Sequence, residues 1–130
     1  MRVNPRLRQS AARYLSVLTD GRYDALALDT DYLPSAESTG GIHPSEAFSG
    51  GTKDALYLSL RLALTDLLSG KEAKPILLDE ALAQLDDKRA TALLTILLHR
   101  AEAGGQSLLF TCHSREERLL EGQNYHKFAL

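Results

Sequence analysis

The sequence predicts an α/β fold with a parallel βαβ core flanked by helices. Two short apolar runs, at residues 75–79 and 107–111, lie on either side of a segment with helical periodicity at 87–103. Apolar runs of this length are typical of strands in a parallel sheet, and the intervening length suits a crossover helix. An N-terminal helix and a small β-hairpin are predicted before this unit.

Length and composition favour one globular domain, residues 1–130, with a single core. The apolar content of 44% and charged content of 25% exclude a disordered or collagen-like chain. No apolar run reaches the ~20 residues that span a bilayer, and the N-terminus lacks the apolar stretch of a signal peptide. We therefore expect a cytoplasmic protein without a membrane partner. Its single cysteine, Cys112, agrees with a reducing compartment.

Charge is distributed unevenly along the chain. The net charge is −2, yet residues 1–22 hold five Arg against one Asp, a local charge of +4. The remaining residues therefore carry −6, so the chain has no overall basic footprint of the kind that nucleic-acid-binding domains show. We interpret the arginine-rich start as a solvated helix face, with a nucleic-acid-binding arm as the alternative.

The N-terminal segment, residues 1–20, predicts an amphipathic helix from Pro5 to about Thr19. Proline suits the first position of a helix, and Asp20-Gly21 suits its end. Apolar residues then recur at helical spacing on a narrow stripe, at Leu7, Ala11, Tyr14, Leu15 and Leu18. This stripe either packs on the domain's own core or continues a coiled coil, and both alternatives remain open.

The predicted hairpin follows this helix. Residues 23–29 alternate in the period of a strand, and a second strand is expected from Asp31, shortened or moved to a sheet edge by Pro34. Residues 35–47 are rich in Ser, Gly, Pro and Glu, and this composition predicts a loop.

The larger C-terminal segment contains the most apolar elements. A helix at 52–68 is apolar around almost its whole circumference, so it must be covered on several sides. The strands at 75–79 and 107–111 are expected to be buried on both faces. A short helix at 114–120 and a last strand at 125–130 complete the predicted fold.

Chemically active groups follow the two predicted parallel strands. Asp79-Glu80 and Cys112-His113 stand at their carboxyl ends, the edge where open parallel sheets bind ligands. One carboxylate could hold Mg²⁺ and the other could orient or deprotonate a water, unless the pair is only a solvated strand end. His113 could contact a phosphate or a water, or be structural. A zinc site of Cys112, His113 and Asp79 is disfavoured because adjacent Cys-His is not a usual ligand spacing.

A second candidate site precedes the apolar helix at Ser49-Gly50-Gly51-Thr52. Glycines allow the backbone to approach a ligand, and the free N–H groups of a helix start can bind an anion. The alternative is a helix cap by Ser49 followed by a flexible turn.

The order and spacing of these segments resemble the C-terminal half of an ATP-binding-cassette (ABC) ATPase head, a P-loop NTPase. Ser49 to Thr52 resemble the signature motif, Ile76 to Glu80 the Walker B strand, Ala81 to Asp87 the D-loop, and His113 the switch histidine. The resemblance covers residues 48–113, about half of the chain. Within it, residues 48–130 would contain the signature helix and the Walker B, D-loop and switch regions.

Residues 52–64 are similar to the chromosome-maintenance and double-strand-break-repair branch of this superfamily, the SMC, SbcC and YhaN-type proteins. Residues 7–28 agree, because a coiled-coil helix in those proteins returns to the head and meets a Gly-Arg-Tyr and strand segment. Two positions differ from the usual pattern: Phe48 replaces a Leu, and Ala81 stands where a Pro commonly follows the acidic pair. Neither change removes a group that touches ATP.

The resemblance implies ATP hydrolysis in the presence of Mg²⁺. Asp79 would hold the metal, Glu80 would polarise the hydrolytic water, and His113 would contact the γ-phosphate. The signature residues Ser49, Gly50, Gly51 and Thr52 would act on the ATP that is bound by a second head. Leu85 and Asp86 of the D-loop would lie at the interface between the two heads, with Asp86 crossing it.

One element of a complete head is absent from the sequence. No Gly-x-x-x-x-Gly-Lys-[Ser/Thr] motif occurs, and Gly70-Lys71-Glu72 lacks both the first glycine and the hydroxyl. Without that loop there is no cradle for the β-phosphate, so the chain alone is expected to be inactive. Part of its large apolar surface should then be an interface for the missing lobe.

The partners implied are therefore an N-terminal lobe, a second head in an ATP-dependent dimer, DNA through the full assembly, and a nuclease subunit as a further candidate. Two other functions stay open. One is the nucleotide-binding engine of a transporter, and the other is a non-catalytic half-head that serves as an interaction module.

Overall fold

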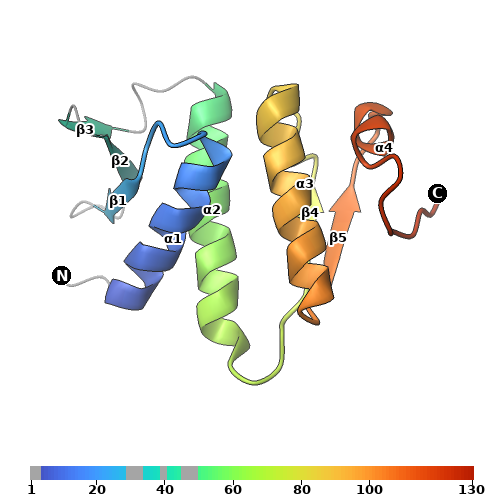
Figure 1. Ribbon diagram of the computed structural model, residues 1–130, viewed down its shortest axis with the longest axis horizontal. Coiled ribbons are helices and arrows are strands. Elements are labelled where there is room, and N and C mark those ends of the chain that lie inside the picture. The colour runs from blue at the N-terminus through green and yellow to red at the C-terminus, as the bar shows by residue number, and fades with distance from the viewer. Residues whose placement is uncertain (1–3, 29–33, 39–40, 45–49) are drawn as a thin grey trace.

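The computed structural model describes residues 4–28, 34–38, 41–44 and 50–130. Its elements in chain order are α1 (Pro5–Leu18), β1 (Ala25–Leu28), β2 (Pro34–Ser38), β3 (Gly41–Pro44), α2 (Gly50–Ser69), β4 (Ile76–Asp79), α3 (Asp87–Glu102), β5 (Ser107–Phe110) and α4 (Arg115–Leu119). Figure 1 shows α1 beside α2, with the small sheet β1-β2-β3 near one end of the pair. Helix α3 and the parallel pair β4-β5 follow, and α4 lies at the side of the molecule opposite the small sheet.

Helix α1 begins where the sequence predicts. The Asn4 side chain accepts a hydrogen bond from the Arg6 N–H at 2.8 Å, and Pro5 occupies the first turn. Two buried residues of its stripe, Ala11 and Leu15, pack in one cluster with Leu56 and Ala63 of α2, and the third, Leu18, packs in a second core cluster. At least this part of the stripe therefore packs on the chain's own core.

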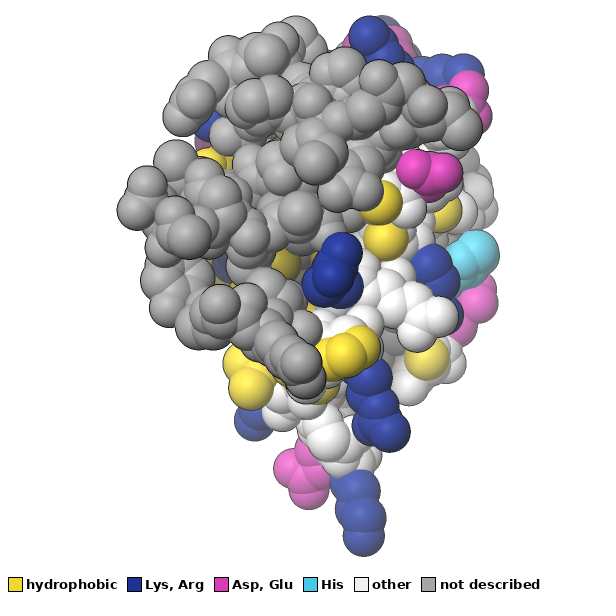
Figure 2. Space-filling model, turned by 90° about the vertical axis from the view of Figure 1, so that its left-hand side faces the viewer, with side chains coloured by type: hydrophobic (Ala, Val, Ile, Leu, Met, Phe, Trp, Pro, Cys, Tyr) yellow, Lys and Arg dark blue, Asp and Glu magenta, His cyan; other side chains and the backbone are white. Residues whose placement is uncertain are grey.

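The basic side chains of α1 lie outside that contact. Arg6, Arg8 and Arg13 are all exposed, as expected of a solvated helix face. Figure 2 shows that Lys and Arg side chains emerge at separate points of the described surface on this side of the molecule.

The predicted loop at 35–47 is wrong for most of its length, because it contains β2 and β3. Strand β2 pairs antiparallel with both neighbours, with Leu26 opposite Ala36 and Ala36 opposite His43. It is thus the central strand of three, so the predicted edge position is wrong; Pro34 is tolerated because it is the first residue of the strand, and residues 31–33 lie outside the described residues. Backbone pairing stabilises these strands although their composition is typical of loops.

Helix α2 is covered on two sides. Leu56 and Ala63 face α1, whereas Ala55, Leu58 and Leu62 pack in a second cluster with residues of β4 and α3. Other apolar side chains of the same helix remain exposed: Tyr57, Leu64, Leu67 and Leu68. Among the described residues, no helix combines the length and apolar character needed to cross a bilayer.

Strands β4 and β5 pair in parallel, with Leu77 opposite Leu108 and Asp79 opposite Phe110, and α3 connects them. This confirms the βαβ core. Burial on both faces was wrongly predicted. Leu78 is fully buried against the helices, but the preceding residue, Leu77, lies on the other face and is 51% exposed. The described helices cover only one face of the pair.

The predicted strand at 125–130 is absent. These residues have no regular structure, and Phe128 is 81% exposed. A strand requires a neighbour for its backbone hydrogen bonds, and no described strand pairs with this segment.

Candidate functional site

The site is built at the carboxyl ends of β4 and β5. Glu80 directly follows β4, and its N–H still donates to the Phe110 carbonyl at 2.8 Å, as if the ladder continued. Its φ of 53° is left-handed, a conformation that is costly for a residue with a long side chain. The chain therefore bends sharply at Glu80, while its backbone stays hydrogen-bonded to β5.

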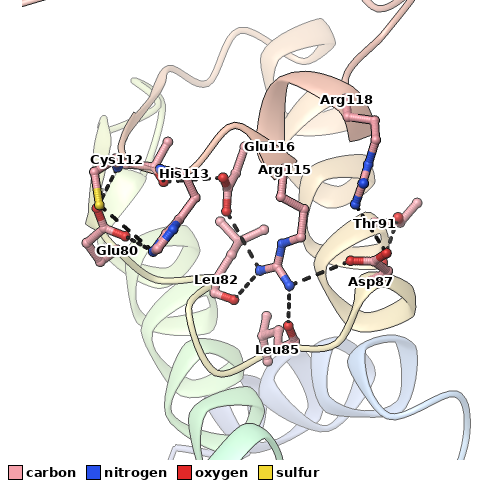
Figure 3. A network of polar contacts seen from close by, with 11 residues as sticks. Glu80, Leu82, Leu85, Asp87, Thr91, Cys112, His113, Arg115, Glu116 and Arg118 are labelled. Atoms are coloured by element: carbon pink, nitrogen blue, oxygen red, sulfur yellow. Dashed lines mark hydrogen bonds and ion pairs between the residues drawn. The ribbon is translucent and has the colours of Figure 1, made fainter.

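This bend brings Glu80 to the segment that follows β5 (Figure 3). Its Oε1 accepts a hydrogen bond from the Cys112 N–H at 2.7 Å, and its Oε2 lies 3.4 Å from Nε2 of His113. The hydrogen bond from the Cys112 backbone holds the pKa of the Glu80 carboxyl below its usual range. Glu80 is therefore charged at neutral pH, as a group that orients or deprotonates a water must be.

Cys112 and His113 are fixed by the same turn. The His113 N–H donates to Thr111 Oγ1 at 3.1 Å, and Sγ of Cys112 lies 3.9 Å from Nε2 of His113. The adjacent Glu80 carboxylate, through its hydrogen bond and its charge, raises the pKa of the Cys112 thiol. The sequence predicted that Glu80 and His113 share one sheet edge, and the structure places them in contact.

Asp79 lies apart from this cluster. It is exposed, on the same face of the pair as Leu77, and makes no hydrogen bond or ion pair to other described side chains. A solvent-accessible carboxylate at the end of a parallel strand is the type of ligand that Mg²⁺ takes, with water and phosphate oxygens in its other positions. The residue present therefore fits the predicted metal.

The turn between Glu80 and α3 has two buried anchors. Leu82 is 1% exposed and Leu85 is 2% exposed, and the Leu85 N–H donates to the Leu82 carbonyl at 3.0 Å. Asp86 is the N-cap of α3, since its Oδ1 accepts from the Arg89 N–H at 2.8 Å. Its carboxylate thus has a local structural role that the sequence comparison with D-loops did not suggest.

The start of α2 lies against this turn. A Cβ atom on Gly51 would be only 2.6 Å from the Gln84 carbonyl oxygen, so only glycine allows the close approach. The neighbouring Thr52 is 4% exposed, and its hydroxyl accepts a hydrogen bond from Nη1 of Arg89 at 2.8 Å. Gly50 is the first residue of α2, whereas Ser49 lies outside the described residues. The predicted signature and D-loop segments are thus in contact within one chain.

Arg115 is a residue that the sequence reasoning missed. Its guanidinium donates to the Leu85 carbonyl at 2.7 Å and to the Leu82 carbonyl at 2.5 Å (Figure 3). It also lies 3.6 Å from Asp87 Oδ1 and 3.7 Å from Oε1 of Glu116, a carboxylate that is 3% exposed. Only its position two residues after His113 could have signalled a role.

The chain was compared with known families and structures. The family model described as SbcC/RAD50-like, Walker B motif, matches residues 16–99. YhaN of Bacillus subtilis, described as uncharacterized, is 32% identical over 111 residues, 84% of this chain and 12% of YhaN. The DNA double-strand break repair Rad50 ATPase of Methanocaldococcus jannaschii is 30% identical over 95 residues, 73% of this chain and 9% of Rad50. This chain therefore spans about a tenth of the length of these relatives.

The fold has solved counterparts. A structure from a study of ATP-driven dimerization and DNA-stimulated activation of SMC ATPases superposes with a TM-score of 0.63 at 20% identity. The superposition covers 86% of this chain and 73% of that one, and shows that the α/β fold is shared. The family match and the YhaN and Rad50 similarities establish that the chain belongs to the SbcC/RAD50-like, Walker B motif family.

Proposed function

We propose that this chain is the C-terminal lobe of an SMC/SbcC-like ATPase head, which hydrolyses ATP in a head dimer and serves DNA repair or chromosome maintenance. The observation that carries the proposal is the contact between Glu80 and His113 at the carboxyl ends of β4 and β5. Family membership supplies the reaction class, because the similar Rad50 protein is described as an ATPase in double-strand break repair.

In this proposal each group at the strand ends has one role. Glu80 is the base that orients the attacking water, and its depressed pKa keeps it charged for that role. His113 contacts the γ-phosphate, and Asp79 holds Mg²⁺, which supplies charge neutralisation for phosphoryl transfer when it is bound.

The signature residues Ser49, Gly50, Gly51 and Thr52 are proposed to act on the ATP of a second head. Dimerization driven by ATP is described for the SMC ATPases with the shared fold. In this chain Gly51 touches the backbone of the turn that carries Leu85 and Asp86. A displacement of that turn at a head interface would therefore move the signature segment with it.

The phosphate-binding loop would come from an N-terminal lobe. Since the motif does not occur in the sequence, the chain alone is proposed to be inactive. The exposed apolar face of the β4-β5 pair, comprising Leu77, Leu108 and Phe110, is the surface we assign to that lobe. Exposed apolar patches of this kind mark interaction sites.

The decisive experiment is Glu80→Gln in a complete head, reconstituted by adding a lobe that carries the phosphate-binding loop. Loss of the base should reduce ATP turnover at least ~10²-fold, while ATP-dependent dimers persist. Turnover is measured by phosphate release, and dimers by light scattering.

The matched control is Glu117→Gln, which removes an exposed carboxylate of α4 that pairs with Lys127 at 2.6 Å. Its turnover should equal that of the unaltered head. Unchanged turnover in Glu80→Gln would show that Glu80 is not the base.

A further inference from the structure

Glu80, Cys112 and His113 also form a group of three metal-binding side chains. One carboxylate oxygen, the thiol sulfur and one imidazole nitrogen all lie within 4.8 Å of one another. Figure 3 shows them converging on the side of the network away from Arg115. Carboxylate, thiolate and imidazole are the three ligand types that zinc uses in proteins, whereas Mg²⁺ does not take a sulfur ligand.

Two of the three distances in the group are close to those of a zinc site. Zn–N, Zn–O and Zn–S bonds of the usual lengths, at tetrahedral angles, place N and O about 3.4 Å apart and S and N about 3.6 Å apart. The corresponding separations here are 3.4 Å between Glu80 Oε2 and His113 Nε2, and 3.9 Å between Cys112 Sγ and His113 Nε2. The third separation, between Cys112 Sγ and a carboxylate oxygen of Glu80, is below 4.8 Å, so the sulfur and the carboxylate would move closer together on binding.

The backbone holds the three ligands ready. Glu80 Oε1 accepts a hydrogen bond from the Cys112 N–H at 2.7 Å. This bond fixes the carboxylate so that its other oxygen, Oε2, faces the His113 ring. The side chains of Glu80 and His113 are 37% and 54% exposed, which leaves a path for an ion from solvent. Three protein ligands and one open position for water are typical of catalytic rather than structural zinc sites.

We propose that Glu80, Cys112 and His113 bind Zn²⁺, and that bound zinc blocks ATP hydrolysis by occupying Glu80 and His113. The thiolate and the carboxylate balance the charge of the ion, and the thiol proton passes to the buffer. Zinc binding follows from the geometry of this chain alone, whereas the inhibitory role rests on the proposed function. The adjacent Cys-His pair thus acquires its third ligand from Glu80, not from Asp79.

The binding step is tested on the chain itself, with Co²⁺ as a spectroscopic probe and Zn²⁺ as the competitor, under a phosphine reductant. We expect one Co²⁺ per chain, a sulfur-to-cobalt charge-transfer band, and displacement by one Zn²⁺. Cys112→Ser should abolish the band, and His113→Gln should weaken binding at least ~10-fold, since even outer-sphere partners contribute that much. Circular dichroism verifies that each variant is folded.

The matched control is His99→Gln, which removes an exposed imidazole of α3 outside the group. It should bind as the unaltered chain does. Absence of the charge-transfer band, or equal loss of binding in His99→Gln and His113→Gln, would overturn the site.

The inhibitory step is tested in the complete head. Zn²⁺ is added to one equivalent beyond the amount that the chelator binds, and this should inhibit ATP turnover in the unaltered head. The Cys112→Ser head, compared with its own rate without zinc, should lose a much smaller share of its turnover. Cysteine-dependent zinc binding without inhibition would overturn the regulatory role and leave the site standing. A head that does not hydrolyse ATP even without zinc would instead contradict the proposed function.

Discussion

Arg115 fastens two distant parts of the site to each other. Its planar guanidinium presents several donors in a fixed fork, and here two of them reach the carbonyls of Leu82 and Leu85. Because Arg115 lies two residues after His113, its side chain joins the turn that follows Glu80 to the segment that carries His113. A displacement of the turn would therefore also displace the segment around Arg115, and the reverse.

Arg115→Gln should weaken this connection. Two carbonyls lose their donors, and the Glu116 carboxylate, which is 3% exposed, loses its cation. We expect the free energy of unfolding to fall by about 1–3 kcal/mol, as for loss of charged hydrogen bonds at a part-buried site. The Ala83 and Leu85 amides, which close the turn, should exchange faster with deuterium. Urea unfolding and hydrogen exchange measure the two effects.

Arg118→Gln is the control for this prediction. Arg118 also pairs with Asp87, at 3.4 Å, but its side chain is 66% exposed, and exposed ion pairs contribute little. Equal destabilisation by the two substitutions would show that charge, rather than the two carbonyl contacts of Arg115, stabilises the turn.

Residue by residue, the sequence predicts groups near strand ends better than it predicts contacts across the fold. The proximity of Glu80 and His113 could be predicted from strand topology alone, because parallel strands end at the same edge of a sheet. The left-handed φ of Glu80 and its bond to the Cys112 N–H could not be foreseen. Arg115 binds a carbonyl 30 residues away, and no local pattern indicates such a partner.

Among the elements, helices are predicted more accurately than strands, because their ends have local causes. Asn4 and Asp86 each cap the helix that follows them by accepting a hydrogen bond from an N–H two or three residues further on, so the start of each helix depends on local sequence. Strands β2 and β3, and the absent strand at 125–130, depend instead on whether a neighbour is available. Local composition carries no information about that neighbour.

The cap of α3 gives a prediction at this scale. Asp86→Ala removes the oxygen that accepts the Arg89 N–H, and should lower the free energy of unfolding by about 0.5–2 kcal/mol. Asp86→Ser keeps an acceptor at the cap and should recover most of the loss. Thermal and urea unfolding of the chain check both values; equal loss in the two variants would rule out capping as the cause.

At the scale of the whole molecule, the exposed apolar face of β4-β5 agrees with the expectation that so much apolar sequence exceeds what these few elements cover. Leu77, Leu108 and Phe110 are 51%, 40% and 45% exposed on that face. The sequence indicated the surplus but not its position. It wrongly suggested burial on both faces, since a continuous apolar strand looks the same whether its second cover belongs to the same chain or to a partner.

Leu77→Asp tests the role of this face. The side chain is half exposed, so the isolated chain should lose less than about 1 kcal/mol of stability. Association with the N-terminal lobe should weaken strongly, because a charge would be buried at the contact. Calorimetric titration of one lobe with the other gives the affinity.

Leu68→Asp, at a 65% exposed position of α2, is the matched control and should bind the lobe normally. If Leu77→Asp binds as tightly as Leu68→Asp, the apolar face is not the contact surface.

The outer edge of β4 carries a further consequence. In a parallel ladder, alternate residues direct their backbone groups to opposite sides, so the Leu77 carbonyl points away from β5. The Arg61 guanidinium donates to this carbonyl from α2. An open strand edge can pair with a further strand, and charged side chains at an edge hinder such pairing. A strand that added beside β4 at Leu77 would therefore first have to displace the Arg61 guanidinium from this carbonyl.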